Sequence, residues 1–356
     1  MNSAQSSARF TALDGVRGVA AIAVVLFHYS QFNDAPWLPR AWLAVDIFVC
    51  LSGFVIAHSY QRKIEAGMSF AEFVRRRLVR LYPLYLFGLL LGAITFLATP
   101  SVRASLSAAA SAKAFALGLL VLPYLSDATL TEGGGAVTGP LFPFNGPAWS
   151  MFFELVANGA FFLLLYLRLQ RLWPIIVVCG VSYLLAAYVD GGLNGGWGTQ
   201  TFAVGFPRVL FAFFVGVALY RLHDFSRASP GHYGSLCVVL MLVVFVLPES
   251  RLVSVAAVLA LGPLIIWTNS AAVPGPRLAS AYRFLGAISY PLYITHVPVL
   301  RGLSLLAPES GWAAPAWVLT LVGTLAAVLV AWAVATLDDA LRRRRFGRGL
   351  SKVQSP

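Results

Sequence analysis

Long apolar runs recur along the whole chain and leave little sequence between them. A run of about 17 to 25 apolar residues is long enough to cross a hydrocarbon core of about 30 Å as a helix. Runs of this kind lie near residues 12–31, 42–60, 81–99, 148–167, 173–190, 203–221, 234–249, 251–270, 284–306 and 315–337. The pattern therefore predicts an all-α, polytopic membrane helix bundle with about ten transmembrane helices.

The segment between the third and fourth runs decides how the later helices are oriented. Residues 105–125 are rich in Ala and Ser and contain Lys113, so this segment is a weak eleventh candidate. If it does not span, the loops rich in Lys and Arg share one side with the chain ends, whereas "DGGLNGGWGTQT" and "APESGWAAP" lie opposite. Lys and Arg favour the cytoplasmic side. We therefore expect cytoplasmic N- and C-termini, with residues 100–147 as an external excursion or half-inserted segment.

These assignments divide the chain into three parts. We expect a cytoplasmic N-terminal tail over residues 1–10, a membrane domain over residues 11–340 and a basic cytoplasmic tail over residues 341–356.

The composition agrees with a membrane protein, because 59% of the residues are hydrophobic and only 11% are charged. Lys and Arg number 26 against 14 Asp and Glu, an excess that cytoplasmic loops explain without a nucleic acid partner. The three cysteines lie singly in apolar runs, and no His stands at metal-ligand spacing from them. We expect neither a disulfide framework nor a metal site.

The first run, "LDGVRGVAAIAVVLFHY", contains three ionisable residues: Asp14, Arg17 and His28. Eleven residues make about three helical turns, so Arg17 and His28 share one face about 16 Å apart, and Asp14 lies one turn from Arg17. Ionisable groups inside a membrane are costly and usually line a site or cavity. His28 is therefore a candidate functional residue, whereas an ion pair at the membrane interface explains Asp14 and Arg17 equally well.

Polar residues also interrupt three later runs. Asp46 lies near the external end of the second run, and Glu154 lies about two turns into the fourth. We expect Glu154 at a depth comparable with His28, which would be an obvious partner for its carboxylate. Tyr293 and His296 lie in "ISYPLYITHVPV", where they can instead satisfy backbone groups freed by proline.

A dense cationic segment, "FVRRRLVRLYPLY", precedes the third run and contains Arg75, Arg76, Arg77 and Arg80. It can be a topology signal that touches anionic lipid head groups. Alternatively it can be a cytoplasmic phosphate site, because the donor fork of Arg suits phosphate oxygens.

Five segments in the same order resemble the motifs of the acyltransferase-3 family of membrane acyltransferases: "LDGVRGVAAIAVVLFHY", "VDIFVCLSGFVIA", "RRRLVRLYPLY", "PAWSMFFELV" and "GAISYPLYITHVPV". The resemblance covers about residues 10–340. It implies transfer of an acyl group, most often acetyl, from cytoplasmic acyl-coenzyme A to a hydroxyl of a carbohydrate, glycolipid or glycoside acceptor. It also implies a bacterial inner membrane, with acetyl-coenzyme A as a co-substrate and no permanently bound cofactor.

The motifs of the family map to Arg17, His28, Arg77, Arg80 and Glu154, and these residues together with the other polar residues give the following candidates. The catalytic candidates are His28 and Glu154. The candidates for binding acyl-coenzyme A are Arg17, Arg76, Arg77, Arg80 and Tyr82. Candidates for contacting the acceptor or supporting the site are Asp14, Asp46, Trp149, Ser150, Asn158, Tyr293 and His296. In this hypothesis His28 is the general base on the acceptor hydroxyl and Glu154 orients it, with a covalent acyl-histidine as the other possible route.

One departure from the family pattern and two rival functions complete the interpretation. The family commonly has Phe-Tyr where this chain has Ala157 and Asn158, so its acceptor can differ from the commonest ones. A proton-coupled transporter or flippase of a surface glycan or lipid-linked precursor would use Asp14, His28 and Glu154 as a proton relay. A non-catalytic scaffold in a surface-polymer complex is the second rival. The sequence indicates no oligomeric state.

Overall fold

The computed structural model describes residues 10–33, 36–132, 135–169, 171–189, 193–223, 229–306 and 314–350. The expected N-terminal tail therefore lies almost wholly outside the described residues, as do the last six residues of the basic tail.

Apolar helices in the described residues coincide with all ten predicted runs. They are α2 (Thr11–Phe32), η1 (Ala41–Leu43) with α3 (Ala44–Glu65), α4 (Phe70–Ala98), α7 (Ala148–Tyr166), α8 (Trp173–Val189), η2 (Thr199–Thr201) with α9 (Phe202–Leu222), α10 (Gly231–Val246), α11 (Arg251–Ala256) with η3 (Ala257–Leu261) and α12 (Gly262–Ala271), α13 (Pro276–Ser304) and α14 (Ala316–Leu350). In the described part of the chain, 7 helices are long and apolar enough to cross a membrane. The shorter α8 and α10 and the more polar α13 complete the bundle, and the predicted fold class is confirmed.

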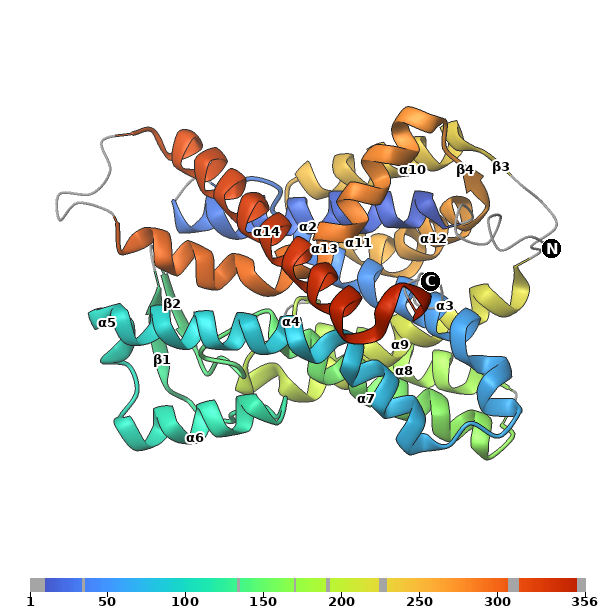
Figure 1. The fold of residues 1–356 in the computed structure, drawn as a ribbon, viewed down its shortest axis with the longest axis horizontal. Helices are drawn as coiled ribbons and strands as arrows, with labels where there is room; N and C mark the ends of the chain where they lie inside the picture. The colour runs from blue at the N-terminus through green and yellow to red at the C-terminus, as the bar shows by residue number, and fades with distance from the viewer. Residues whose placement is uncertain are drawn as a thin grey trace.

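The remaining elements are small. They are α5 (Pro100–Arg103), α6 (Ala108–Leu119), β1 (Thr129–Glu132), β2 (Gly135–Thr138), β3 (Ser229–Pro230) and β4 (Ala272–Val273). The strands β1 and β2 form an antiparallel hairpin in which Thr129 pairs with Thr138. Figure 1 places α5 and the hairpin at one end of the bundle, and the turn between α3 and α4 at the other.

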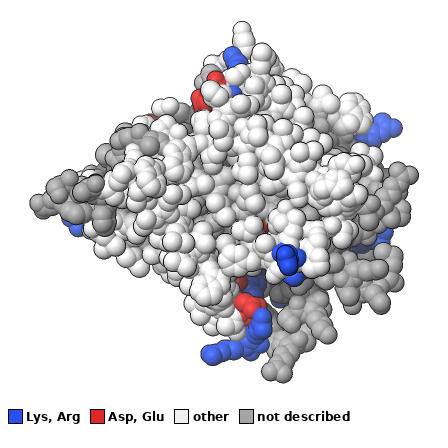
Figure 2. Space-filling model, turned by 90° about the horizontal axis from the view of Figure 1, so that it is seen from above, with Lys and Arg blue, Asp and Glu red and all other residues white. Residues whose placement is uncertain are grey.

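Most of the outer surface is uncharged. Figure 2 shows a broad face that is mostly white, on which Lys, Arg, Asp and Glu form a few small groups, mainly toward its edges. Apolar side chains such as Ile94, Val178 and Leu329 are more than half exposed. Because lipid tails take the place of a partner for such side chains, this surface suits a bilayer.

The helices α2 and α13 run parallel and pack very closely. A Cβ atom at Gly15 would lie 2.3 Å from the ring of Tyr282, and one at Gly18 would lie 2.3 Å from Leu285 Cβ. Small residues permit this approach between membrane helices. Their close packing places the polar residues of the first run directly against α13.

Two prolines, Pro291 and Pro298, lie inside α13, yet the helix continues through both. Because Pro298 has no backbone N–H, the carbonyl of Ile294 loses its usual partner. Asn145 Nδ2 donates to this carbonyl oxygen at 3.0 Å. A side chain from the segment before α7 therefore satisfies the group that proline frees, as membrane helices require.

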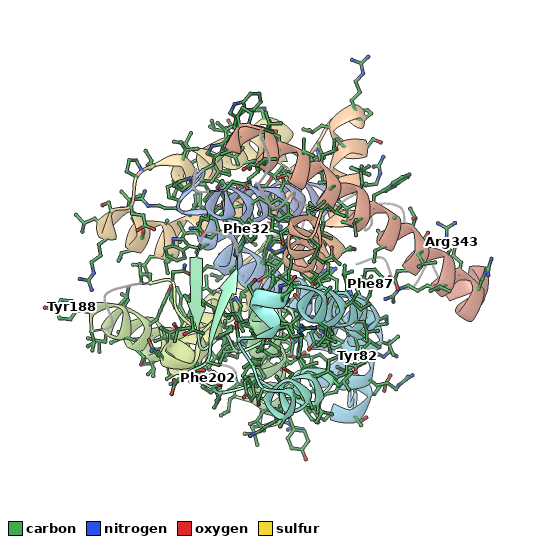
Figure 3. The ribbon with its side chains drawn as sticks, turned by 90° about the vertical axis from the view of Figure 1, so that its left-hand side faces the viewer. Phe32, Tyr82, Phe87, Tyr188, Phe202 and Arg343 are labelled. Atoms are coloured by element: carbon green, nitrogen blue, oxygen red, sulfur yellow. The ribbon has the colours of Figure 1, made fainter. Side chains whose placement is uncertain are left out.

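The helix α6 lies within residues 105–125 and has only 12 residues, which are too few to cross a membrane. It ends beside α4, and the chain then returns to the hairpin (Figure 1). Two tyrosines of α4 satisfy the last carbonyls of α6: Tyr82 Oη donates to Leu119 O at 2.8 Å, and Tyr85 Oη donates to Gly118 O at 2.5 Å. Figure 3, which looks along the bundle from the hairpin end, labels Tyr82. The YPLY motif thus holds the buried end of α6.

Replacing Tyr85 with Phe is expected to loosen this end of α6. The change removes only the hydroxyl and leaves the buried Gly118 carbonyl without its donor, which costs about 1–3 kcal/mol. Thermal unfolding of the purified protein in detergent should show a lower midpoint than wild type. Tyr166→Phe, at a side chain that is 71% exposed, is the matched control. Equal midpoints for Tyr85→Phe and the control would contradict this role.

Candidate active site

Two histidines from α2 and α13 meet inside the bundle. His28 Nδ1 lies 3.3 Å from His296 Nε2, and the ring centroids are 5.0 Å apart. His296 is fully buried, whereas His28 remains partly exposed. Tyr29, the residue after His28, donates from its hydroxyl to the His296 carbonyl oxygen at 2.8 Å and fixes the two helices at this level.

Backbone carbonyls set the tautomers of both rings. His28 Nδ1 lies 2.9 Å from Val24 O, and His296 Nδ1 lies 2.8 Å from Tyr293 O. A carbonyl oxygen only accepts, so each neutral ring carries its proton on Nδ1. His296 Nε2 then offers a lone pair to the Nδ1–H of His28. The remaining nitrogen, His28 Nε2, carries a lone pair and has no hydrogen-bond partner among the described residues.

Glu154 pairs with an arginine rather than with a histidine. Its Oε1 accepts from Arg77 Nη2 at 2.8 Å and from Ser52 Oγ at 2.6 Å. No hydrogen bond or ion pair joins Glu154 to His28 in the described structure. The expected contact between them is therefore replaced by one with Arg77, whose guanidinium neutralises the carboxylate inside the bundle.

The contacts of α13 also correct the expected depth of Glu154. Tyr293 Oη lies 2.9 Å from Ser150 Oγ, and Tyr290 Oη lies 3.6 Å from Met151 Sδ. Glu154 follows Met151 by one turn, in the direction away from His296. It therefore lies roughly two or more helical turns from His28 along the bundle.

Partly exposed polar side chains connect the level of the histidine pair and the level of Glu154 to the start of α2. We call this set the polar column: Asp14, Arg17, Ser52, Glu154, Tyr290, Tyr293 and His28. The exposed fractions of the Asp14, Arg17 and Glu154 side chains are 30%, 27% and 24%. Because their helices pack inside the bundle, this exposure means that the polar column is not tightly covered by neighbouring side chains.

We call the end of the polar column at the start of α2 its lower end and the end at His28 its upper end. At the lower end, Arg17 Nη2 donates to Asp14 Oδ1 and to Gly286 O, each at 3.0 Å. Arg80 lies close enough to Arg17 and Arg77 to interact with both electrostatically. It has no ion-pair partner among the described residues, and its carbonyl accepts from Arg342 Nη2 of α14 at 3.0 Å. Three of the predicted arginines therefore gather here.

Arg76 is separate from this group. It is exposed and pairs with Glu72, one turn earlier in α4, at 2.6 Å.

Asp46 belongs to a buried ion pair that the sequence analysis missed. Its two carboxylate oxygens accept from Arg208 Nε at 2.9 Å and Nη2 at 2.8 Å. Arg208 also donates to Gly195 O at 2.8 Å and lies 5.3 Å and 5.4 Å from the rings of Trp42 and Trp149. These contacts with Arg208 indicate a structural role for Asp46 and Trp149. The signal for Arg208 was an arginine in the interior of the apolar run 203–221, whose other arginine, Arg221, is its last residue.

The remaining predicted residues lie in different parts of the bundle. Ser150 and Tyr293 bind each other one turn below His296. Asn158 is buried one turn after Glu154 and contacts neither histidine in the described structure. Tyr82 donates to the end of α6. The structure thus gathers His28, His296, Tyr293 and Ser150 at one level, and Arg17, Arg77 and Arg80 at another.

Comparison with known proteins gives a family match over most of the chain. A family described as "Acyltransferase domain" matches residues 10–336. The chain is 30% identical over 366 aligned residues to a protein named "Acyltransferase MdmB" from Streptomyces mycarofaciens, covering 92% of this chain and 88% of that protein. It is 40% identical over 163 residues to "Protein 2 in picA locus" from Rhizobium radiobacter, covering 43% of this chain and 81% of that protein.

A shorter similarity reaches a larger protein. The chain is 37% identical over 79 residues to "O-acetyltransferase OatA" from Staphylococcus aureus, covering 21% of this chain and 12% of that protein. No solved structure matches the chain.

Proposed function

This chain belongs to the acyltransferase-3 family of integral membrane acyltransferases, and from this premise we propose that it transfers an acetyl group from acetyl-coenzyme A to a hydroxyl of a carbohydrate-containing acceptor. The similarity to the O-acetyltransferase OatA supports transfer to an oxygen atom. The acceptor would be a surface carbohydrate, a glycolipid or a glycoside, and the membrane would be the bacterial inner membrane.

The observation that carries this proposal is the unpaired Nε2 of His28 at the upper end of the polar column. This nitrogen takes the proton of the acceptor hydroxyl while the hydroxyl oxygen attacks the thioester carbonyl. The carbon–sulfur bond then breaks, and the leaving thiolate takes the proton from His28 Nε2. The products are the acetyl ester and free coenzyme A, and the histidine returns to its starting form.

His296 supplies the support that the sequence analysis assigned to Glu154. Its Nε2 accepts from His28 Nδ1 and keeps the proton on that nitrogen, so Nε2 of His28 stays available as the base. When His28 becomes charged, the same hydrogen bond has a charged donor and is strengthened.

The lower arginines provide a place for the phosphates of coenzyme A. Arg76 and Arg77 are engaged by Glu72 and Glu154, whereas Arg80 has no carboxylate partner among the described residues. We therefore propose Arg80 as the main phosphate contact, with Arg17, which Asp14 also binds, beside it. The arm of coenzyme A would rise along the polar column from there, over the roughly 16 Å of α2 between Arg17 and His28.

Mass spectrometry of surface glycans and small glycosides from cells with and without the gene tests this function. We expect acetyl esters that appear only with the gene and are lost on mild alkaline treatment. Unchanged acetylation in every carbohydrate fraction would contradict the proposal.

Two replacements of His296 test its role in positioning His28. Gln keeps an acceptor near the position of Nε2, whereas Asn is shorter and reaches only the Tyr293 carbonyl. We expect His296→Asn to lower kcat by about 10- to 100-fold, since a hydrogen bond to a charged group contributes about 1.5–3 kcal/mol. The KM for acetyl-coenzyme A should hardly change, and His296→Gln should restore much of the loss. Equal kcat losses for Asn and Gln would indicate a packing role only.

A further inference from the structure

A groove outside the polar column has no role in the proposed reaction. It has a volume of about 460 Å³ and lies between α4 and α7, against the end of α6. Phe73, Val74 and Leu78 of α4, Leu155 of α7 and Leu120 after α6 form its apolar walls. Its volume falls within the range of about 300–1,000 Å³ that is usual for small-molecule sites.

Two residues that line this groove, Arg77 and Asn158, carry buried polar atoms without a hydrogen-bond partner. Asn158 is 2% exposed, and neither its Nδ2 nor its Oδ1 has a hydrogen-bond partner in the described structure. Arg77 is 5% exposed, and its Nε is likewise unpaired while Nη2 holds Glu154. Leaving such a group unpaired costs about 1–3 kcal/mol. An occupant that accepts from Asn158 Nδ2 and Arg77 Nε, once these side chains turn toward the groove, would remove this cost.

The rim of the groove is apolar. Phe70 and Leu120 are 52% and 69% exposed, so the opening suits a hydrocarbon chain. Gly159 adds room, because a Cβ atom there would meet nothing within 4 Å.

An exposed cation lies one turn from a lining residue of the groove along α4. Arg75 is exposed and lies one turn before Leu78, and it has no carboxylate partner among the described residues. Arg76, by contrast, is engaged by Glu72. An unpaired arginine beside an apolar slot fits an amphiphile with an anionic head group.

We propose that this groove binds an anionic glycerophospholipid of the phosphatidylglycerol type. One acyl chain lies against the apolar walls, and its ester carbonyl accepts from Asn158 Nδ2 and Arg77 Nε. The phosphate pairs with Arg75, and a head-group hydroxyl donates to Asn158 Oδ1. Because Arg77 also holds Glu154, the bound lipid contacts the residue that borders the polar column.

The surroundings of the groove favour a lipid over the acyl donor. No residue of the polar column lines the groove, and residues 119–121 at the end of α6 form part of its wall. A thioester in this slot would lie apart from His28. This proposal therefore does not depend on acyl transfer, and its test needs no activity.

Native mass spectrometry of the full-length protein in detergent tests the proposal, with equal amounts of phosphatidylglycerol and phosphatidylethanolamine that carry the same chains. We expect wild type to retain one phosphatidylglycerol with at least tenfold preference. Gly159→Leu adds an apolar side chain at a position where a Cβ atom meets nothing within 4 Å, and it should lower retention at least tenfold. Val178→Leu, which changes an exposed apolar residue of α8, is the matched control and should retain the lipid as wild type does.

Two further variants separate the parts of the site. Asn158→Leu should lower retention several-fold, because an apolar side chain of similar size cannot bond the ester. Arg75→Gln should bring the preference between the two lipids close to parity. Thermal midpoints near that of wild type would show that these variants are folded. Wild type without bound phosphatidylglycerol, equal retention by Gly159→Leu and Val178→Leu, or displacement of the lipid by acetyl-coenzyme A would each overturn the proposal.

Discussion

Replacing His28 with Gln is expected to lower kcat for acetyl transfer by about 10²- to 10⁴-fold, the usual contribution of a general base. Gln has nearly the size of His and places its amide group near the position of Nε2, but an amide nitrogen is not basic. The KM for acetyl-coenzyme A should change little, because the proposed phosphate site lies at the other end of the polar column. Steady-state kinetics of the purified variant measure both quantities.

His232→Gln is the matched control for this experiment. His232 lies at the start of α10, where its ring contacts Tyr233, with centroids 4.2 Å apart, and it belongs to neither the polar column nor the histidine pair. The control should keep the kcat of wild type. A His28→Gln enzyme with kcat within a few-fold of the control would exclude His28 as the base.

Replacing Asp46 with Ala is expected to destabilise the protein by about 3–5 kcal/mol, because it leaves the Arg208 guanidinium buried without its counter-charge. Arg208 is 1% exposed and bridges α3, α9 and the segment around Gly195. Low yield and a much lower thermal midpoint in detergent should result. Asp46→Asn keeps one acceptor oxygen and should fall between Ala and wild type.

A double replacement distinguishes an unpaired charge from simple loss of packing. Replacing a buried ion pair with apolar residues of similar size is often nearly neutral. Asp46→Leu with Arg208→Met should therefore recover much of the stability that Asp46→Ala loses. A double variant as unstable as Asp46→Ala would contradict the explanation by charge.

The helices of this bundle were predictable from sequence because a membrane imposes a length on each apolar run. The start of α4 was not predictable in this way. The helix begins at Phe70, and the charged segment between Phe70 and the apolar run is helical as well. The tyrosines of the YPLY motif gave no sign of their hydrogen bonds to α6. These bonds join residues 33 and 37 positions apart, and helical periodicity describes only neighbours along one helix.

The sequence predicted which residues belong to the candidate site, but it did not predict which of their side chains contact each other. Helical spacing placed Arg17 and His28 on one face, but spacing cannot tell which side chain of another helix meets them. Glu154 was therefore assigned to His28, whereas its partner is Arg77. His296 was assigned a lesser role because its partner, 268 positions away, is visible only in the folded bundle.

These pairs also weigh against the proton relay of a transporter. The two carboxylates of that relay, Asp14 and Glu154, are each held by an arginine. Each carboxylate would have to leave its arginine before it could take part in such a relay. The histidine pair has no carboxylate partner in the described structure, which suits a base that starts neutral.

Acetyl transfer by the purified protein is the most direct test of the proposed function. The protein is placed in phospholipid vesicles with acetyl-coenzyme A labelled in the acetyl group and with extracted surface glycans and glycolipids as acceptors. We predict label in an alkali-labile ester on carbohydrate, with one coenzyme A released per ester and with the signal lost in His28→Gln. Carbohydrate that stays unlabelled with the wild-type protein, or label that is equal in His28→Gln, would contradict the account.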